Sequence, residues 1–239
     1  MNKEKLNSKY KDLAEFYGYR IPLNEFFQCS LSVDCVVFGY HHNDVKVLLI
    51  KRGAEPFMGK WALPGDLMYP DENLNCAAMR VLRDLTGIEN LFMEQAHTFG
   101  EKDRHPIGRV ITVSYYALVN IEDYNPKPHS WAKDLEWHSL SNIPELAFDH
   151  RNILSGAMQK LRTNLWSRPV GLNMLPQKFT LNDVQQLYEL ILSEKFDKAN
   201  FRKRMLNSDF ITPLEEQQSN VRHRPAKLYK LTDNLNPKS

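Results

Sequence analysis

The sequence has no long apolar run, few cysteines, and no internal repeat or low-complexity tract. Its apolar runs stay below the roughly 18 residues of a membrane span, and no apolar signal-peptide core follows the polar start MNKEKLNSKYKD. We therefore expect a cytoplasmic protein without membrane association. Cys29, Cys35 and Cys76 are too few and too scattered for a disulfide framework or a zinc site, so we expect three small buried apolar side chains.

Charge is distributed unevenly along a chain of otherwise ordinary composition. Hydrophobic residues make up 42% and charged residues 25% of the 239 residues, which is typical of a globular protein with a packed core. The net charge is +2, yet residues 195–230 contain nine Lys and Arg against four Asp and Glu, an excess of five positive charges. This asymmetry indicates that the C-terminal end meets a polyanion.

The first part of the chain alternates strand-like and helix-like segments. The apolar runs SVDCVVFGY and VKVLLIKR flank the turn-forming HHND and predict a hairpin, and helical spacing over 74–86 predicts a helix that ends at Gly87. Strands are expected in MEQAHTFG, RVITVSYYALV and DLEWHSL, and a helix in DHRNILSGAMQKLRTNL. This order predicts an α+β fold with a mixed sheet.

Proline and glycine in WSRPVGLNMLPQK predict a linker at 166–178. The chain then divides into a polar N-terminal segment at 1–29, a first domain at 30–165 and a second domain at 179–239. In the second domain, Thr180 and Asp183 have the spacing of a capping box, and a helix is expected in FTLNDVQQLYELIL. Asp197 can cap another helix, in which Phe201, Met205 and Leu206 face the core.

A helix, a short break and a basic helix are typical of a helix-turn-helix, and two strands around a basic loop predict its wing. The alternative to DNA binding is that these residues form a solvated basic surface on a small accessory domain. Residues expected to bind DNA are Lys198, Asn200, Arg202, Lys203 and Arg204 on the helix and Arg222, His223 and Arg224 in the wing.

The segment Gly65 to Ile88, GDLMYPDENLNCAAMRVLRDLTGI, resembles the Nudix box, G-x5-E-x7-R-E-U-x-E-E-x-G-U, where U is aliphatic. Glu72, Arg80, Leu82 and Gly87 stand at the required places, whereas Gly65 lies one position early and Asp66 occupies its slot. The resemblance implies a Nudix-like mixed-sheet α/β/α sandwich.

The box departs from the family pattern where the family holds magnesium. The three acids that follow its arginine are here Val81, Asp84 and Leu85, and an aliphatic side chain can neither bind the ion nor polarise a water. We therefore expect no hydrolase activity, no metal and no cofactor. Arg80 and Glu72 either pair to hold the fold or contact a ligand.

Together with FTLNDVQQLYELIL, DKANFRKRM and RHRPAKLYKL, the degenerate box resembles the Nudix-related transcriptional regulators, which include ADP-ribose-sensing regulators of NAD synthesis and regulators of arabinose use. The likeness spans residues 31–232. It implies a repressor or activator with an effector-binding domain and a C-terminal winged helix-turn-helix domain, acting as a homodimer on a palindromic operator in double-stranded DNA.

Polar side chains expected around the effector are Lys51, Arg52, Gly65, Asp66, Glu72, Arg104, Arg109, Asp149 and His150. Without the magnesium-binding acids, only Lys51, Arg52, Arg104 and Arg109 could offset the negative charge of a diphosphate. A neutral pentose needs no such compensation, so we favour an arabinose-like sugar over ADP-ribose. Two other functions remain open: an active Nudix hydrolase of a nucleoside diphosphate-linked substrate with an accessory basic domain, and a module that binds protein partners.

Overall fold

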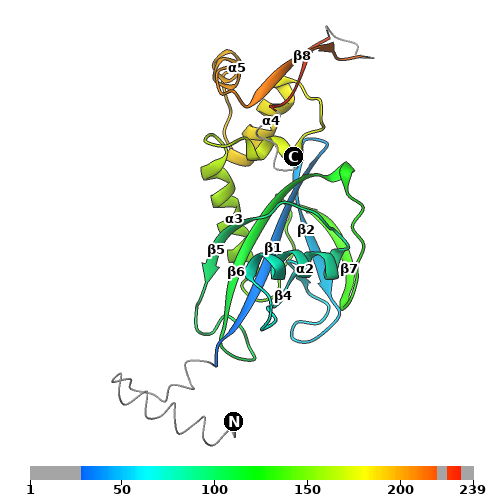
Figure 1. Ribbon diagram of the computed structural model, residues 1–239, viewed down its shortest axis with the longest axis vertical. Helices are drawn as coiled ribbons and strands as arrows, with labels where there is room; N and C mark the ends of the chain where they lie inside the picture. Colours follow the sequence, from blue (N-terminus) through cyan, green and yellow to red (C-terminus); the bar gives the residue numbers. More distant parts are fainter. Residues whose placement is uncertain (1–27, 220–224, 233–239) are drawn as a thin grey trace, which may run out of the picture.

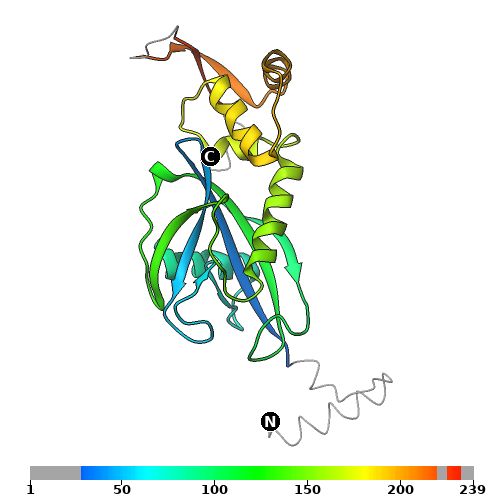
Figure 2. The same ribbon diagram turned by 180° about the vertical axis from the view of Figure 1, so that it is seen from behind.

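The computed structural model describes residues 28–219 and 225–232, which form a sheet with helices and a smaller C-terminal unit (Figure 1, Figure 2). The strands are β1 Ser30–His41, β2 Asp44–Arg52, β3 Trp61–Ala62, β4 Gly65–Leu67, β5 Glu94–Phe99, β6 Val110–Asn120, β7 Ala132–Ser139, β8 Ile211–Gln217 and β9 Lys227–Leu231. The helices are α2 Leu74–Thr86, α3 His150–Asn164, α4 Leu181–Leu192 and α5 Lys198–Leu206, with 3-10 helices η2 Ile121–Asp123 and η3 Pro169–Met174. Across the described residues, no helix has the length and apolar character that crossing a membrane requires.

The first seven strands form one mixed sheet. The sequence predicts a mixed sheet, but the short strands β3 and β4 lie in the segment 53–73, where no strand is predicted. Strand order is β3-β2-β1-β6-β5, with β4 paired to β1 and β7 to β2. β1 runs parallel to β6 and antiparallel to β2, and the two residues between β1 and β2, His42 and Asn43, both have positive φ. Asn and His tolerate this left-handed conformation better than most residues, so HHND folds as the expected tight turn.

Alternate side chains of β1 enter two separate cores. Cys35 and Val37 pack with α2, whereas Val36 and Phe38 pack with α3. α2 lies across one face of the sheet in Figure 1, and α3 lies across the other face in Figure 2. A strand that is buried on both faces reads as a nearly continuous apolar run. The three-layer α/β/α sandwich is therefore confirmed.

Only one of the three cysteines is a buried apolar side chain. Cys35 is buried under α2, but Cys29 is half-buried and Cys76 is exposed, so the expectation of three buried thiols is wrong. Cys29 precedes β1, and Cys76 lies on the solvent side of the first turn of α2.

α2 begins and ends where the sequence predicts. The Asn73 side chain accepts a hydrogen bond from the Cys76 amide, and Gly87 ends the helix at φ 71°, where a side chain would be strained. Val81 and Leu85 lie on the buried face, at 0% and 1% exposure. These two positions of the box therefore supply packing against the sheet.

The C-terminal unit is a winged helix-turn-helix, as expected. Thr180 and Asp183 form the predicted capping box of α4, and the Asp197 side chain caps α5 through the Asn200 amide. β8 and β9 form the wing, in which Tyr229 also exchanges two backbone hydrogen bonds with Phe179.

Two details of the C-terminal unit and its junction differ from a simple helical pattern. Phe201 and Met205 are buried as predicted, but Leu206 is 52% exposed, because it is the last residue of α5 and follows Met205 on the helix. The segment 166–178 contains η3, whose Leu172 and Met174 are buried in the same core as α3 and α4.

Candidate functional site

A cavity of about 300 Å³ opens at one end of the sheet, where β1 pairs with β4 and the loops after β2 and β5 come together. Its polar lining side chains include Asp34, Arg52, Asp66, Arg104, His105 and His150, and its aromatic walls are Trp131 and Phe148. A concave site that combines flat apolar walls with a few placed charges suits a small polar ligand.

Arg52 is held between two aromatic rings. Its guanidinium carbon lies 4.7 Å from the centroid of Trp131 and 5.0 Å from that of Phe148, while Nε donates to the carbonyl of Pro56 at 2.7 Å. Burial lowers the pKa of Arg52, opposed by the charge of Asp66. Stacking and the Nε bond fix the plane of the guanidinium, which prepares it for an anion in the cavity.

A buried polar network forms the floor of the cavity around Asp34. Thr112 donates its hydroxyl to Asp34 Oδ2 at 2.6 Å, and His150 Nε2 lies 3.4 Å from Oδ1. His150 Nδ1 accepts the Leu63 amide, so its proton resides on Nε2, and burial lowers its pKa. Arg104 approaches Asp34 to 4.0 Å. The floor therefore presents a carboxylate with neutral donors and one guanidinium around it.

The structure brings together a subset of the predicted effector residues. Those that line the cavity are Arg52, Gly65, Asp66, Arg104 and His150. Asp149 lies behind Arg104 and binds it through two hydrogen bonds of 2.7 and 2.9 Å. Lys51, Glu72 and Arg109 are placed outside this cavity: Lys51 lies over the Trp61 ring, and Arg109 is exposed.

Several cavity residues were not among the sequence predictions. Asp34 left a usable signal, because it is the one carboxylate inside the apolar run SVDCVV, and a buried charge requires a reason. Trp131, Phe148 and His105 come from loops, where no periodic pattern marks them. His105 stacks on Phe148 with ring centroids 5.1 Å apart.

Glu72 and Arg80 are fully engaged with each other. Arg80 Nε and Nη2 donate to the two carboxylate oxygens of Glu72 at 2.9 and 2.6 Å, and Nη2 also donates to the Leu67 carbonyl. Both side chains are 13% exposed, and the Tyr69 ring lies 4.0 Å from the Arg80 guanidinium carbon. Of the two roles that the sequence leaves open for these residues, the structure therefore shows the pairing, which holds the loop before α2 onto the helix.

This pair makes the stability of the chain depend on pH. Arg80 lowers the pKa of Glu72 from 4.5 to about 2, so its contribution is present above pH 4.5 and is lost as the pH falls toward 2. Urea unfolding should show that Glu72→Gln destabilises the chain at pH 7 and that this difference shrinks in acid. A difference that stays constant as the pH falls from 7 to about 3.5 would contradict this role.

The box positions do not fit the magnesium ion of Nudix hydrolases. Val81 and Leu85 are buried aliphatic side chains, and the Asp84 carboxylate accepts two hydrogen bonds from Arg83. Glu72 is saturated by Arg80 and the Tyr69 amide. In residues 28–219 and 225–232, no three His, Cys, Asp or Glu side chains are placed to hold a metal ion.

The exposed face of α5 carries most of the side chains predicted to bind DNA. Lys198, Asn200, Arg202 and Lys203 are exposed, and Arg202 lines a concave surface between α4 and the wing. The turn before α5 is fixed by Glu189, which accepts hydrogen bonds from Lys195, Gln185 and the Phe196 amide.

The remaining predicted DNA contacts differ in what the structure shows of them. The guanidinium of Arg204 lies 3.5 Å from the centroid of Trp166, so this side chain is stacked on the junction between the two units. The wing residues Arg222, His223 and Arg224 lie outside the described residues.

An α/β/α sandwich with a degenerate Nudix box, followed by a winged helix-turn-helix with a basic helix, defines the class of Nudix-related transcriptional regulators. The family models agree: residues 30–157 match the NUDIX domain, and residues 171–231 match the NrtR DNA-binding winged helix domain. The chain belongs to the NrtR family of Nudix-related transcriptional regulators.

Individual relatives support this assignment. The chain is 34% identical over 206 residues to the ADPR responsive transcriptional repressor NtrR of Acinetobacter baylyi, covering 84% of this chain and 81% of the relative. It resembles the crystal structure of Shewanella oneidensis NrtR complexed with a 27mer DNA, with a TM-score of 0.71, 31% identity, and coverage of 84% of this chain and 93% of that one. The NUDIX domain of the Shewanella protein, complexed with ADP ribose, matches with a TM-score of 0.54 and 32% identity over 62% of this chain and 97% of that domain.

Proposed function

We propose that this chain is a DNA-binding transcriptional repressor whose Nudix-type domain binds ADP-ribose and thereby changes the affinity of the winged helix for its operator. The relatives named above are an ADP-ribose-responsive repressor and proteins crystallised with DNA and with ADP-ribose. The observation that carries the proposal is Arg52, stacked on two aromatic rings in an open cavity with charged and aromatic walls, on the same chain as an exposed basic helix.

The cavity offers each part of ADP-ribose a matching group. Arg52 can donate to the diphosphate, the Trp131 and Phe148 rings can contact the base, and the Asp34 carboxylate can accept hydrogen bonds from ribose hydroxyls. These groups, with the relatives, favour ADP-ribose over the arabinose-like sugar preferred from the sequence. The preference for a sugar rested on the missing magnesium-binding acids, whereas the cavity still offers a diphosphate the guanidinium groups of Arg52 and Arg104.

The DNA is contacted by the exposed side chains of α5 and by the wing. Basic side chains on a recognition helix meet base edges and phosphates in the major groove, and wing arginines meet phosphates or the minor groove. We assign Lys198, Asn200, Arg202 and Lys203 to this contact, together with the wing residues predicted from the sequence. A homodimer on a palindromic operator would place two such helices roughly 34 Å apart, and it requires two chains per duplex in a DNA titration.

The repressor does not hydrolyse its effector at an appreciable rate. Val81 and Leu85 replace two magnesium-binding acids, so the diphosphate lacks the ion that would stabilise charge and orient water. Incubation of the chain with ADP-ribose and magnesium should give no AMP above the rate without protein, while an active ADP-ribose hydrolase run in parallel gives full conversion.

The alternative function is an active hydrolase with an accessory basic domain. Magnesium-dependent release of AMP that disappears in Glu72→Gln would support that alternative and contradict the loss of catalysis. Glu72 is the suitable position for this variant because it is the acid of the box that this sequence retains as Glu at the place the family pattern requires.

A further inference from the structure

One helix runs from the effector cavity to the DNA-binding unit. α3 begins at His150, which lines the cavity, and ends at Asn164, beside the winged helix (Figure 2). Its 15 residues span roughly 22 Å at 1.5 Å per residue. We propose that α3 transmits the state of the effector cavity to the recognition helix α5. Arg162, near the C-terminal end of α3, and Trp166, just beyond it, are the positioning residues that contact the winged helix. This inference rests on the proposed function.

The cavity end of α3 is tied to a ligand-facing arginine. Asp149 occupies the N-cap position, where an Asp side chain ordinarily accepts a hydrogen bond from the first turn, yet it makes no such bond. Its carboxylate instead binds Arg104, which lines the cavity. A ligand that binds Arg104 therefore acts on the N-cap residue of α3 through this one side chain.

The other end of α3 holds both helices of the helix-turn-helix. Arg162 Nε donates to the carbonyl of Ile191 at 2.7 Å, and its Nη2 donates to the Ser193 hydroxyl at 3.2 Å. These bonds fix the C-terminus of α4 at the turn into α5. Two residues beyond α3, Trp166 lies under the guanidinium of Arg204 on α5, at 3.5 Å from the centroid.

Packing allows α3 to move as one body with these contacts. Its buried side chains, Ile153, Leu154, Ala157 and Leu161, belong to one core that continues into α4 and α5. A close-packed core resists local deformation and passes a displacement on. A shift at the cavity end thus reaches the recognition helix through packed atoms and two specific contacts.

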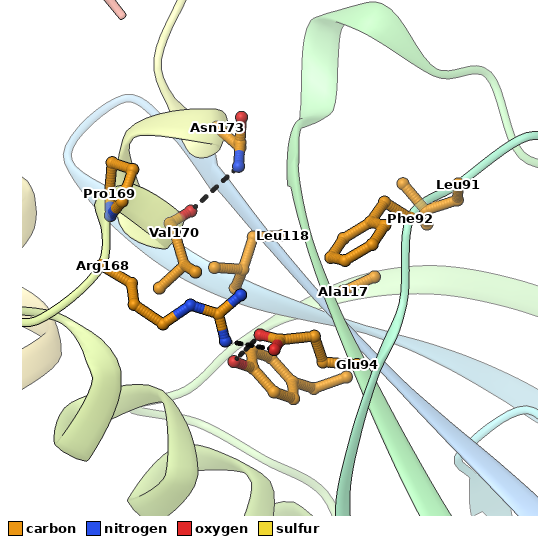
Figure 3. A pocket seen from close by; sticks show the side chains of 10 residues that line it. Leu91, Phe92, Glu94, Ala117, Leu118, Arg168, Pro169, Val170 and Asn173 are labelled. Atoms are coloured by element: carbon orange, nitrogen blue, oxygen red, sulfur yellow. Dashed lines mark hydrogen bonds and ion pairs between the residues drawn. The ribbon is translucent and has the colours of Figure 1, made fainter. Parts of the chain in front are cut away.

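A polar cluster ties the end of α3 to the sheet as well. Asn164 donates to the Tyr116 hydroxyl, which donates to Glu94, and Glu94 pairs with Arg168. Figure 3 shows Glu94 and Arg168 facing each other. Both residues line a small cavity of about 100 Å³. The C-terminal end of α3 therefore contacts both domains, so a displacement of α3 changes how the winged helix sits on the sheet.

The test measures the coupling between the two ligands in the full chain. The duplex is one that the wild-type chain selects from a randomised pool, and the coupling factor is the ratio of its Kd with and without saturating ADP-ribose. We expect Arg162→Met to reduce this coupling factor at least about threefold toward one. The Kd for ADP-ribose, measured without DNA, should stay within about twofold of the wild-type value. Arg162→Lys, which keeps one donor, should restore part of the coupling.

Arg151→Met is the matched control. Arg151 also lies on α3 and donates to carbonyls, but to those of Ile143 and Pro144 within the first domain. Trp166→Leu, which removes the ring under Arg204 and keeps an apolar side chain, tests the second contact if Arg162→Met fails to fold. Coupling that stays at the wild-type value in both Arg162→Met and Trp166→Leu would overturn the inference, whereas a wild-type factor of one would overturn the proposed function itself.

Discussion

Replacing Arg202 and Lys203 together by alanine should weaken binding of the selected operator duplex by about tenfold or more at ~50 mM salt. Both side chains are exposed on α5, and neither forms an ion pair with another described residue of the C-terminal unit. If each meets a phosphate, the slope of log affinity against log salt should fall by roughly 0.9 per contact. Fluorescence anisotropy over a salt series measures both quantities.

The control removes two positive charges far from α5. Arg83→Ala with Lys102→Ala changes the net charge by the same amount on the first domain, where the two side chains are 52% and 85% exposed. This double variant should bind the duplex as the wild type does. Equal weakening in both double variants would mean that only overall charge matters, and α5 would then not be the recognition helix.

ADP-ribose at 100 times its Kd should raise the Tm by roughly 5–10 °C, because such binding adds ~2.7 kcal/mol to the stability of the folded chain. Arg52→Gln should lose most of this shift, since it removes the guanidinium that is fixed between Trp131 and Phe148 and that we propose binds the diphosphate. A thermal-shift series with ADP-ribose, L-arabinose and other pentoses measures the effect. The pentoses should leave the Tm unchanged.

Lys51→Gln is the matched control for this site. It removes the same charge from the neighbouring residue of β2, whose side chain points to the other face of the strand and lies over Trp61. It should keep the full ADP-ribose shift. An equal loss in both variants, or a pentose shift as large as that of ADP-ribose, would contradict the proposed cavity.

Periodicity and end signals in the sequence were sufficient for most of the fold. The apolar runs around HHND predict the hairpin of β1 and β2, helical spacing and Gly87 define α2, and the Thr180 capping box begins α4. These signals are local, so they survive without knowledge of the tertiary contacts. Leu206 was misplaced because the end of a helix lacks a further turn to cover its last apolar residue.

The cavity was predicted less completely, because its residues meet only through the tertiary fold. Arg52 and Lys51 are neighbours on β2, so their side chains point to opposite faces of the strand. Only the fold shows that the face of Arg52 borders the cavity and that the face of Lys51 does not. Trp131 and Phe148 lie in separate loops, so nothing in the sequence shows that both stack on Arg52. Glu72 was expected to bind the effector because it belongs to the Nudix box, but in the structure its carboxylate is paired with Arg80.

The central claim is that ADP-ribose bound in the Nudix-type domain changes how tightly the winged helix holds DNA. Its most direct test is the anisotropy titration of the selected duplex with wild type and Arg52→Gln, each with and without saturating ADP-ribose. We predict that ADP-ribose changes the wild-type Kd at least about fivefold, the low end of typical coupling between two sites, and leaves that of Arg52→Gln unchanged. A wild-type Kd that does not move, although ADP-ribose raises the Tm of the same sample, would contradict the account.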